Sequence, residues 1–276
     1  MSRLGGRIVL VTGASRGLGK AIAVTLAAEG AHVAVVARTL EAHDGQPGSL
    51  RETANAIVGS GGQATPFAAD LSDPENCEQL VASIRARLGD PTVLVNSAAV
   101  TFLRPLANFP LSRTRVMLNL HLLTPLRLAQ LLAPGMRAAG AGWIVNLTSV
   151  AAQPNPGPPF DEFAAAAGFG MYGTVKAALD RLTSSLAAEF QDAGIAVNAA
   201  APLLPVATPG ARTLDLAKSG TEDISLICRT VLELCTGDPR VLTGRVEYTT
   251  PFLERLRAGD VPGAHAGAAA SKETIR

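Results

Sequence analysis

The stretch 7–38, RIVLVTGASRGLGKAIAVTLAAEGAHVAVVAR, decides the fold of this chain. It begins with the apolar run 8–11, which is typical of a strand buried on both faces. A turn with three glycines, TGASRGLG at 12–19, leads directly into a helical pattern of apolar residues that ends at Gly30. A second apolar run, 32–37, follows at once. The stretch therefore predicts a strand, a glycine turn, a helix and a second strand.

The glycine turn is the first candidate for a binding site. Glycines let backbone amides approach a phosphate closely, and the positive end of a helix dipole favours negative charge. A tight turn without a ligand is the alternative, but a strand before the turn and a helix after it are the context that dinucleotide binding needs. Gly13, Gly17 and Gly19 give the spacing TGxxxGxG, which differs from GxGxxG.

The length, composition and charge limit the classes of protein to which this chain can belong. A chain of 276 residues that is 47% hydrophobic suits one large α/β domain with a sizeable core, and with 4% aromatic residues that core must be filled by Ala, Val and Leu. A net charge of +1 gives no electrostatic reason to expect a nucleic acid or an anionic membrane as partner. We expect no run of membrane-spanning length, no secretory signal and a cytoplasmic location.

The cysteines and histidines suggest no metal chemistry. Three cysteines without a CxxC pair indicate a reducing compartment and no metal site. The four histidines are scattered without ligand spacing, and we assign no chemistry to them. They are His32, His43, His121 and His265.

Strand and helix patterns alternate along the rest of the chain. Further strands are predicted at 64–69, 92–95, 143–147, 195–199 and 242–248. Helices are predicted at 50–58, 74–88, 113–132 with an irregularity at Pro125, 171–190 and 222–235. The alternation predicts a Rossmann-like, doubly wound parallel sheet of about seven strands with helices on both faces, in three layers. Residues 1–260 would form a single nucleotide-binding and catalytic domain, followed by a loose tail at 261–276.

The second decisive motif is YGTVK, at 172–176. Residues four apart lie on one face of a helix, so Tyr172 and Lys176 should be neighbours. A tyrosine with an ordinary pKa near 10 is a poor acid–base catalyst at neutral pH. A cation beside it stabilises the phenolate, and we expect Lys176 to lower the pKa of Tyr172 toward the useful range. The motif is weak alone but strong after a nucleotide-binding turn.

Together, the glycine turn and the Tyr–Lys pair resemble the short-chain dehydrogenase/reductase family over nearly the whole chain, from 7 to about 248. The resemblance implies that Tyr172 exchanges a proton with the substrate oxygen, and that Lys176 holds the nicotinamide ribose and tunes the tyrosine. It implies that Ser149 hydrogen-bonds the substrate oxygen and that Asn119 anchors a proton-relay water. Taken singly, Ser149 could be a strand-end cap and Asn119 an ordinary polar residue in a helix.

The resemblance also implies a cofactor site. Its residues are Gly13, Ser15, Arg16, Gly17, Leu18, Gly19, Arg38, Asp70, Leu71, Asn96, Tyr172, Lys176, Pro202 and Thr208. A site selective for NAD(H) wants an acid at the end of the second strand, but this chain has Ala37 and then Arg38 there. Arg16 is a second cation, and the guanidinium fork suits a 2′-phosphate, so we expect NADP(H) to be preferred over NAD(H). Two solvated surface arginines are the alternative.

Three features depart from the family pattern. NSAA at 96–99 stands where the family usually has NNAG, and Leu203 replaces a glycine after Pro202. The interval from Ser149 to Tyr172 is 23 residues, which is longer than usual because of the insert 153–170. Its prolines, phenylalanines and few charges suggest a wall of the substrate pocket, and thus an uncharged, apolar carbonyl compound such as a ring ketone or an acyl chain. A subunit contact by the insert is the alternative.

Function and assembly can be stated as expectations. We expect an NADP(H)-dependent oxidoreductase that interconverts a carbonyl compound and a secondary alcohol, with no nucleic-acid or membrane partner. A catalytically silent nucleotide-binding regulator, or an epimerase or dehydratase of the same fold, is the alternative. The helices 113–132 and 171–190 carry more leucines than one sheet-facing stripe requires, and the resemblance implies that they form a homodimer or homotetramer.

Overall fold

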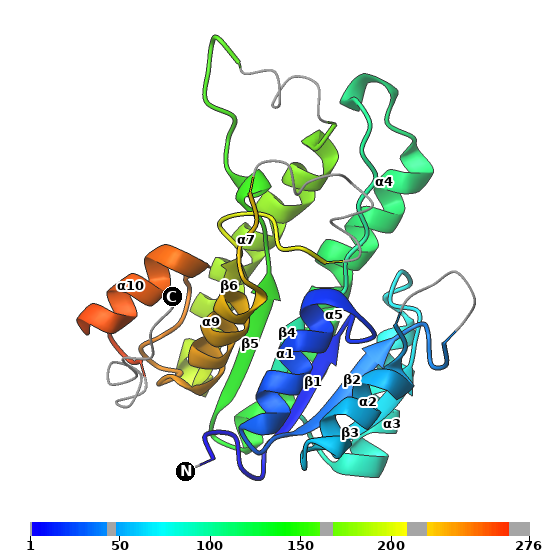
Figure 1. Ribbon diagram of the computed structural model, residues 1–276, viewed down its shortest axis with the longest axis vertical. Coiled ribbons are helices and arrows are strands. Elements are labelled where there is room, and N and C mark those ends of the chain that lie inside the picture. The colour runs from blue at the N-terminus through cyan, green and yellow to red at the C-terminus, as the bar shows by residue number, and fades with distance from the viewer. Residues whose placement is uncertain (1, 43–47, 161–167, 209–219, 265–276) are drawn as a thin grey trace.

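A computed structural model of the protein describes residues 2–42, 48–160, 168–208 and 220–264. Its centre is a seven-stranded parallel sheet in the order β3-β2-β1-β4-β5-β6-β7 (Figure 1). The strands are β1 (Ile8–Thr12), β2 (His32–Ala37), β3 (Gln63–Ala68), β4 (Val93–Asn96), β5 (Gly142–Leu147), β6 (Ile195–Ala201) and β7 (Val246–Tyr248). This confirms the predicted Rossmann-like fold class.

The helices cover both faces of the sheet. They are α1 (Gly17–Ala28), α2 (Leu50–Gly59), α3 (Asn76–Leu88), α4 (Leu111–Leu118), α5 (Thr124–Ala138), α7 (Gly170–Phe190), α9 (Ile224–Thr236) and α10 (Thr249–Ala258). A π-helical turn, η2 (Asn119–Leu123), joins α4 to α5, and short 3-10 turns lie at Leu106–Asn108, Val150–Ala152 and Gln191–Ala193.

Alternation along the strands divides the core into two layers. Val9 and Val11 of β1 pack in the cluster with α1, α2, α9 and α10, whereas Leu10 packs in the cluster with α3, α5 and α7. All three residues are fully buried, because side chains of a strand point alternately to opposite faces and both faces are covered. The strand order reverses between β1 and β4, which is where ligands bind in such sheets.

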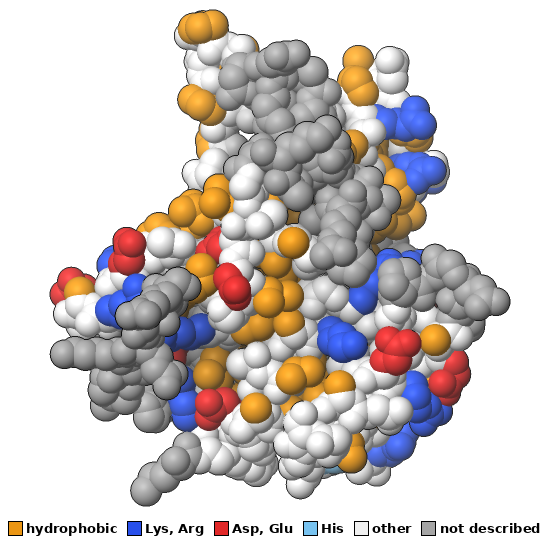
Figure 2. All heavy atoms as spheres, in the orientation of Figure 1, with side chains coloured by type: hydrophobic (Ala, Val, Ile, Leu, Met, Phe, Trp, Pro, Cys, Tyr) orange, Lys and Arg blue, Asp and Glu red, His pale blue; other side chains and the backbone are white. Residues whose placement is uncertain are grey.

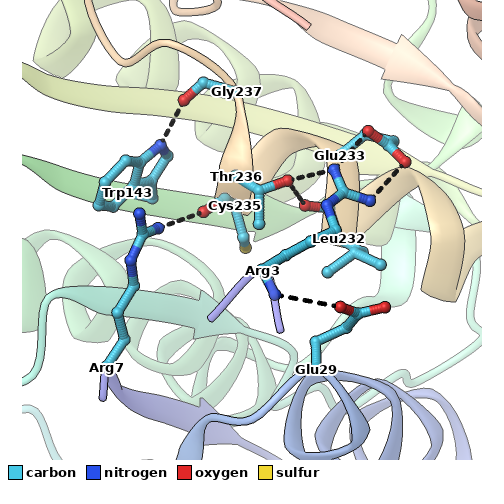
Figure 3. Close-up of polar contacts among 9 residues, drawn as sticks. All are labelled: Arg3, Arg7, Glu29, Trp143, Leu232, Glu233, Cys235, Thr236 and Gly237. Carbon is cyan, nitrogen blue, oxygen red and sulfur yellow. Dashed lines mark hydrogen bonds and ion pairs between the residues drawn. The ribbon is translucent and has the colours of Figure 1, made fainter. Parts of the chain in front are cut away.

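The N-terminal segment is tied to α9 (Figure 3). Arg3 makes two hydrogen bonds to the carboxylate of Glu233, with Nη1 2.8 Å from Oε1 and Nη2 2.7 Å from Oε2. Arg7 donates to Cys235 O and lies over the Trp143 ring, 4.0 Å from its centroid. Because the Glu233 side chain is 2% exposed, this ion pair is part of the interior and not a solvated surface contact.

Several elements differ from the sequence prediction. The irregularity expected at Pro125 is the π turn just before it, and Pro125 itself lies in the first turn of α5, where its missing N–H leaves no hydrogen bond unmade. The last strand is shorter than predicted, and α10 was not predicted. Leu256, Phe252 and Leu253 of α10 are buried against the core.

The helical stretch Leu111–Ala138 bears on the expectation that no run of membrane-spanning length is present. It is long and apolar enough, by length and composition, to cross a membrane, with a mean hydropathy of 1.3 in its window. However, 44% of that window is buried inside the protein, as in a core helix that packs on a sheet. Its α5 part packs against β5 and α3.

Candidate active site and cofactor site

The glycine turn forms a cradle at the carboxyl end of β1. A Cβ atom on Gly19 would lie 2.3 Å from the Gly13 oxygen, and one on Gly13 would lie 2.8 Å from Ala98 Cα, so neither position admits a side chain. Gly13 and Gly17 also have positive φ, at 67° and 58°. Helix α1 begins at Gly17 with no side-chain cap and no acid in its first turn. Its first amides can therefore bind an anion, and the cradle fits the pyrophosphate of a dinucleotide.

Arg38 and Asp70 lie together at the ends of β2 and β3, and both are exposed. The pKa of Asp70 is below its ordinary value, mainly because the Ser72 backbone N–H donates to its carboxylate at 3.0 Å, and the Arg38 charge adds to this effect. Leu71, the next residue, is buried. Arg16 is exposed in the glycine turn, so Arg16 and Arg38 are both available to an anionic group on the cofactor.

The loop after β6 reaches back over the glycine turn. A Cβ atom on Gly17 would lie 3.6 Å from Thr208 Cβ, which brings the predicted Thr208 beside the predicted cradle. Glu222 holds this loop, because its Oε2 accepts the N–H groups of Leu203 at 2.7 Å and Leu204 at 3.1 Å, and it also bonds the Thr249 hydroxyl. Sequence reasoning missed Glu222, since an acid directly before a helix is expected to serve the helix start.

Two neighbouring strand ends supply Asn96 and Thr12. The Asn96 amide donates to Asn146 Oδ1 at 2.8 Å, which links β4 to β5. Thr12 Oγ1 accepts the N–H groups of Ser97 and Ala98, both at 3.0 Å. These bonds hold the turn after β4 against β1, beside the glycine cradle.

Ser149 and Tyr172 meet at the end of β5. Ser149 is the second residue after the strand. It accepts the Ala151 N–H at 3.2 Å and is hydrogen-bonded to the Tyr172 hydroxyl. A Cβ atom on Gly173 would lie 2.4 Å from the Ala151 oxygen, so this glycine lets α7 approach the turn that carries Ser149. Ser149 and Tyr172 thus lie side by side in the structure, although they are 23 residues apart along the chain.

The pKa of Tyr172 corrects one expectation. Burial raises it to about 12, and only the Ser149 hydrogen bond opposes that rise. The prediction that Lys176 lowers this pKa is wrong for the protein alone, because removal from water disfavours the phenolate more than its neighbours favour it. Lys176 Nζ lies 5.6 Å from the centre of the tyrosine ring.

Lys176 is buried beneath Tyr172. It is 3% exposed, and its ammonium donates to Leu147 O at 2.6 Å. Burial lowers the pKa of Lys176 to about 8, while the carboxylate of Asp180, one turn further along α7, raises it. Burial in turn raises the pKa of Asp180. Burial thus makes this ammonium easier to deprotonate than that of an exposed lysine.

His121 lies in the candidate site, although its spacing along the chain indicates no ligand or catalytic role. It is 1% exposed, its Nε2 lies 2.8 Å from Val100 O, and its ring meets that of Tyr172 edge-on at 5.7 Å. Burial lowers the pKa of His121 to about 3, and the Lys176 charge lowers it further, so the ring is neutral at physiological pH. The one available signal was its place two residues after Asn119 in the same helix.

Asn119 opens the π turn between α4 and α5. Its amide donates to Ser72 O at 2.9 Å, which ties this helix to the segment after β3. Its own carbonyl accepts the N–H of Thr124, five residues along. This longer hydrogen-bond step is the structural basis of the irregularity in the helix.

Part of the insert 153–170 lies outside the described residues, namely 161–167. Gln153 Nε2 donates to Tyr248 Oη at 2.6 Å, and Arg104 N donates to Gly168 O at 3.3 Å. Phe160 is 58% exposed. The expected tail beyond 264 is also outside the described residues, whereas Val261 is buried.

The chain belongs to the short-chain dehydrogenase family, whose model matches residues 7–218. Together with its relatives, this identifies the protein as an NAD(P)-dependent short-chain dehydrogenase/reductase.

The relatives differ in how much of their own length matches this chain. The chain is 35% identical over 257 residues to the short-chain reductase protein NovJ of Streptomyces niveus, covering 93% of this chain and 90% of the relative. It is 33% identical over 202 residues to the ketoacyl reductase HetN of Nostoc sp., covering 73% of this chain but only 64% of that protein. The solved structure of L-sorbose reductase from Gluconobacter frateurii, complexed with NADPH and L-sorbose, aligns with a TM-score of 0.75 and 26% identity over 90% of this chain and 97% of that one.

Proposed function

We propose that this enzyme interconverts a carbonyl compound and a secondary alcohol, with NADP(H) as its preferred cofactor. The observation that best supports this proposal is the Ser149–Tyr172 hydrogen bond above the buried Lys176, beside the glycine cradle. This arrangement places a proton donor and a second hydroxyl side by side, where one substrate oxygen can contact both. Asn119 completes the set proposed from the sequence.

Each side chain has a separate task in reduction. Tyr172 donates its phenolic proton to the carbonyl oxygen, and the Ser149 hydroxyl stabilises the charge that develops on that oxygen. The Lys176 ammonium stabilises the phenolate left behind, which burial alone would disfavour. When bound, the nicotinamide supplies the hydride. In oxidation the same groups act in reverse, with Tyr172 as the base.

The preference for NADP(H) rests on Arg16 and Arg38. Both are exposed near the cradle, and β2 ends in Ala37 without an acid to accept a ribose hydroxyl. The guanidinium groups suit a 2′-phosphate, whose charge Asp70 alone would repel. L-sorbose reductase, a structural relative, was solved with NADPH.

An uncharged, apolar carbonyl substrate is the proposed class. Large hydrophobic side chains are exposed in the segments beyond the carboxyl ends of β4, β5 and β6: Leu106, Leu111, Val150, Phe160, Leu203 and Leu204. Figure 2 shows hydrophobic side chains in the upper part of the molecule, around the α4 region. Exposed apolar groups gathered at one end mark a surface that binds apolar partners.

Assembly and location complete the proposal. Leu123 of η2 is 43% exposed, while Leu179 and Leu186 of α7 are buried, so the apolar excess of these helices lies only partly inside the subunit. We propose a homodimer or homotetramer through α4, α5 and α7, and a cytoplasmic location. A monomeric mass by light scattering at micromolar concentration would contradict the assembly.

The function is tested by a panel of carbonyl compounds and alcohols with both cofactors. The panel should include apolar ketones and polyhydroxylated ketones, because the relatives of the chain include an L-sorbose reductase and an L-xylulose reductase. Tyr172→Phe should abolish turnover while cofactor binding, followed by fluorescence, stays nearly unchanged. Ser149→Ala should lower kcat by about a hundredfold. Lys176→Ala should impair both turnover and cofactor binding. Substantial turnover in Tyr172→Phe would refute the assignment, and a preference for polyhydroxylated ketones would refute the apolar substrate.

A further inference from the structure

The buried carboxylate of Glu222 lies where three segments of the chain meet. They are the loop after β6, the start of α9 and the start of α10. Glu222 is 8% exposed, and none of the ion pairs among the described residues includes it. A buried carboxylate without a cation needs hydrogen bonds in place of the water that it loses. Its hydrogen-bond partners therefore indicate its role.

The acceptor capacity of this carboxylate is fully used. Oε2 accepts the N–H groups of Leu203 and Leu204, at 2.7 and 3.1 Å. Oε1 accepts the hydroxyl groups of Thr249 and Thr250, the latter at 3.4 Å. A carboxylate has about four lone-pair sites, so these four donors saturate it. Glu222 thus joins the loop after β6 to the first residues of α10.

The adjacent acid, Asp223, has a different role. Its side chain accepts the Ser225 N–H at 2.7 Å and so caps the N-terminus of α9. Glu222 is therefore not needed as the cap of this helix, and its oxygens are used for the backbone of the loop instead. Two neighbouring acids thus serve two different elements, one the helix and the other the loop.

The start of α10 is the base on which Glu222 holds the loop. Ala201 and Tyr248, the last residues of β6 and β7, are paired in the sheet, so the two strands end at the same level. Thr249 begins α10, is fully buried, and also accepts the Leu203 N–H at 3.2 Å. Helix α10 packs on α9 and β7 (Figure 1). The loop after β6 is therefore hydrogen-bonded to a packed helix.

The same loop continues to the glycine cradle. Val206 and Glu222 form a parallel β-bridge, and Glu222 N donates to Pro205 O at 2.9 Å. Thr208 N donates to Val206 O at 2.7 Å, and Thr208 is the residue that lies beside Gly17 of the cradle. The backbone and the side chain of Glu222 therefore both hold the stretch of chain that leads to Thr208.

We propose that Glu222 is a positioning residue of the cofactor site: it uses the start of α10 as its base and sets where Thr208 lies against the glycine cradle. None of the proposed catalytic residues is among its described hydrogen-bond partners, so its contribution is to cofactor affinity and not to proton transfer. The same bonds place Leu203 and Leu204, whose side chains are exposed, at the carboxyl end of β6. The inference rests on the proposed function only in the choice of NADPH as the first probe.

Amide hydrogen exchange of the protein without cofactor tests these hydrogen bonds directly. We expect the amides of Leu203 and Leu204 to exchange slowly in the wild type and fast in Glu222→Leu. Asp223→Asn is the matched control, because it removes the adjacent acid and should leave both amides protected. Amides that exchange fast in the wild type would overturn the proposal. This readout needs no turnover, so it is distinguishable from failure of the proposed function, which Tyr172→Phe tests.

Fluorescence titration with NADPH, and with NADH in parallel, tests the positioning role. In Glu222→Leu the Kd for the cofactor should rise roughly tenfold to a hundredfold, because cofactor binding must then order the loop. Glu222→Gln should restore most of the affinity, since its amide oxygen can accept both N–H groups and its NH₂ group can donate to the threonine hydroxyls. A Kd in Glu222→Gln as high as in Glu222→Leu would overturn the role assigned to these hydrogen bonds.

Tyr248→Phe separates this role from a general loosening of the start of α10. It removes the hydroxyl that accepts from Gln153 Nε2 and leaves the bonds of Glu222 intact, so it should keep the wild-type Kd. An equal rise of Kd in Tyr248→Phe, or an unchanged Kd in folded Glu222→Leu, would overturn the proposal. If Glu222→Leu does not fold, Thr249→Val decides, because it removes a hydroxyl at the base: a raised Kd supports the proposal, and a wild-type Kd overturns it.

Discussion

Replacing Lys176 with methionine should abolish turnover and, at the same time, stabilise the folded protein at neutral pH. The lysine is 3% exposed, and its pKa falls from 10.5 to about 8 because burial disfavours the ammonium. A shift of one pKa unit corresponds to about 1.4 kcal/mol, so the buried charge destabilises the folded state by roughly 3 kcal/mol below pH 8. The variant loses the bond to Leu147 O, which costs about 1–3 kcal/mol. The net gain should be about 1 kcal/mol.

The pH dependence of the stability difference distinguishes the buried Lys176 charge from other causes of that difference. Between pH 8 and 10.5 the unfolded lysine still holds its proton while the folded lysine has lost it, so the wild type gains stability as pH rises. The methionine variant lacks this gain. Its stability relative to the wild type should therefore fall by roughly 3 kcal/mol across that window. Groups that titrate in this window without contacting Lys176 are shared by both proteins and cancel in the difference.

Urea denaturation at several pH values from 7 to 10.5 measures the difference. Lys20→Met is the matched control, because it removes a lysine that lies on α1 and is only partly buried. A wild-type-minus-Lys176→Met difference that stays constant across the window would refute the reasoning. So would turnover in Lys176→Met.

Further predictions concern the cofactor, the N-terminal ion pair and acid stability. Arg38→Ala should lower the ratio of kcat/KM for NADPH to that for NADH at least tenfold; an unchanged ratio contradicts the assigned selectivity. Glu233→Gln should lower the free energy of unfolding by roughly 3 kcal/mol, because it leaves the Arg3 charge unpaired. Glu41→Gln, which breaks the exposed Arg51–Glu41 ion pair, should cost less than about 1 kcal/mol. Wild type should lose stability as pH falls from 6.5 toward 3, since the unfolded His121 binds a proton that the folded one does not; equal loss in His121→Gln, by urea denaturation, would count against this.

The sequence predicted the parts of the site that depend on local spacing. The glycine cradle follows from three glycines between a strand and a helix, and the closeness of Tyr172 and Lys176 follows from the helical period. Ser149 could be placed because parallel strands end at one edge of a sheet. Each of these inferences needs only the neighbours along the chain or the direction of a strand.

The remaining features depend on burial, which spacing does not reveal. The pKa of Tyr172 rises because the ring is removed from water, and the sequence shows only that a cation lies nearby. Glu222 holds the loop after β6 through contacts with residues about 20 positions earlier. His121 reaches the site because the helix takes a π turn there, and a side chain in a regular helix would be placed differently.

Several buried polar side-chain atoms of the described residues have no hydrogen-bond partner within the protein, and some of them lie around Lys176. Three of the eight such atoms among the described residues, Asn96 Oδ1, His121 Nδ1 and Asp180 Oδ1, belong to residues around Lys176, and the others include atoms of Arg3, Thr230 and Arg245. An apolar core at this place would be more stable, since buried charges and unpaired acceptors both oppose folding. The chain keeps them around the lysine whose ammonium is proposed to stabilise the Tyr172 phenolate. Substitutions that stabilise the fold should therefore be easiest to find around Lys176, and they should be the ones that reduce turnover.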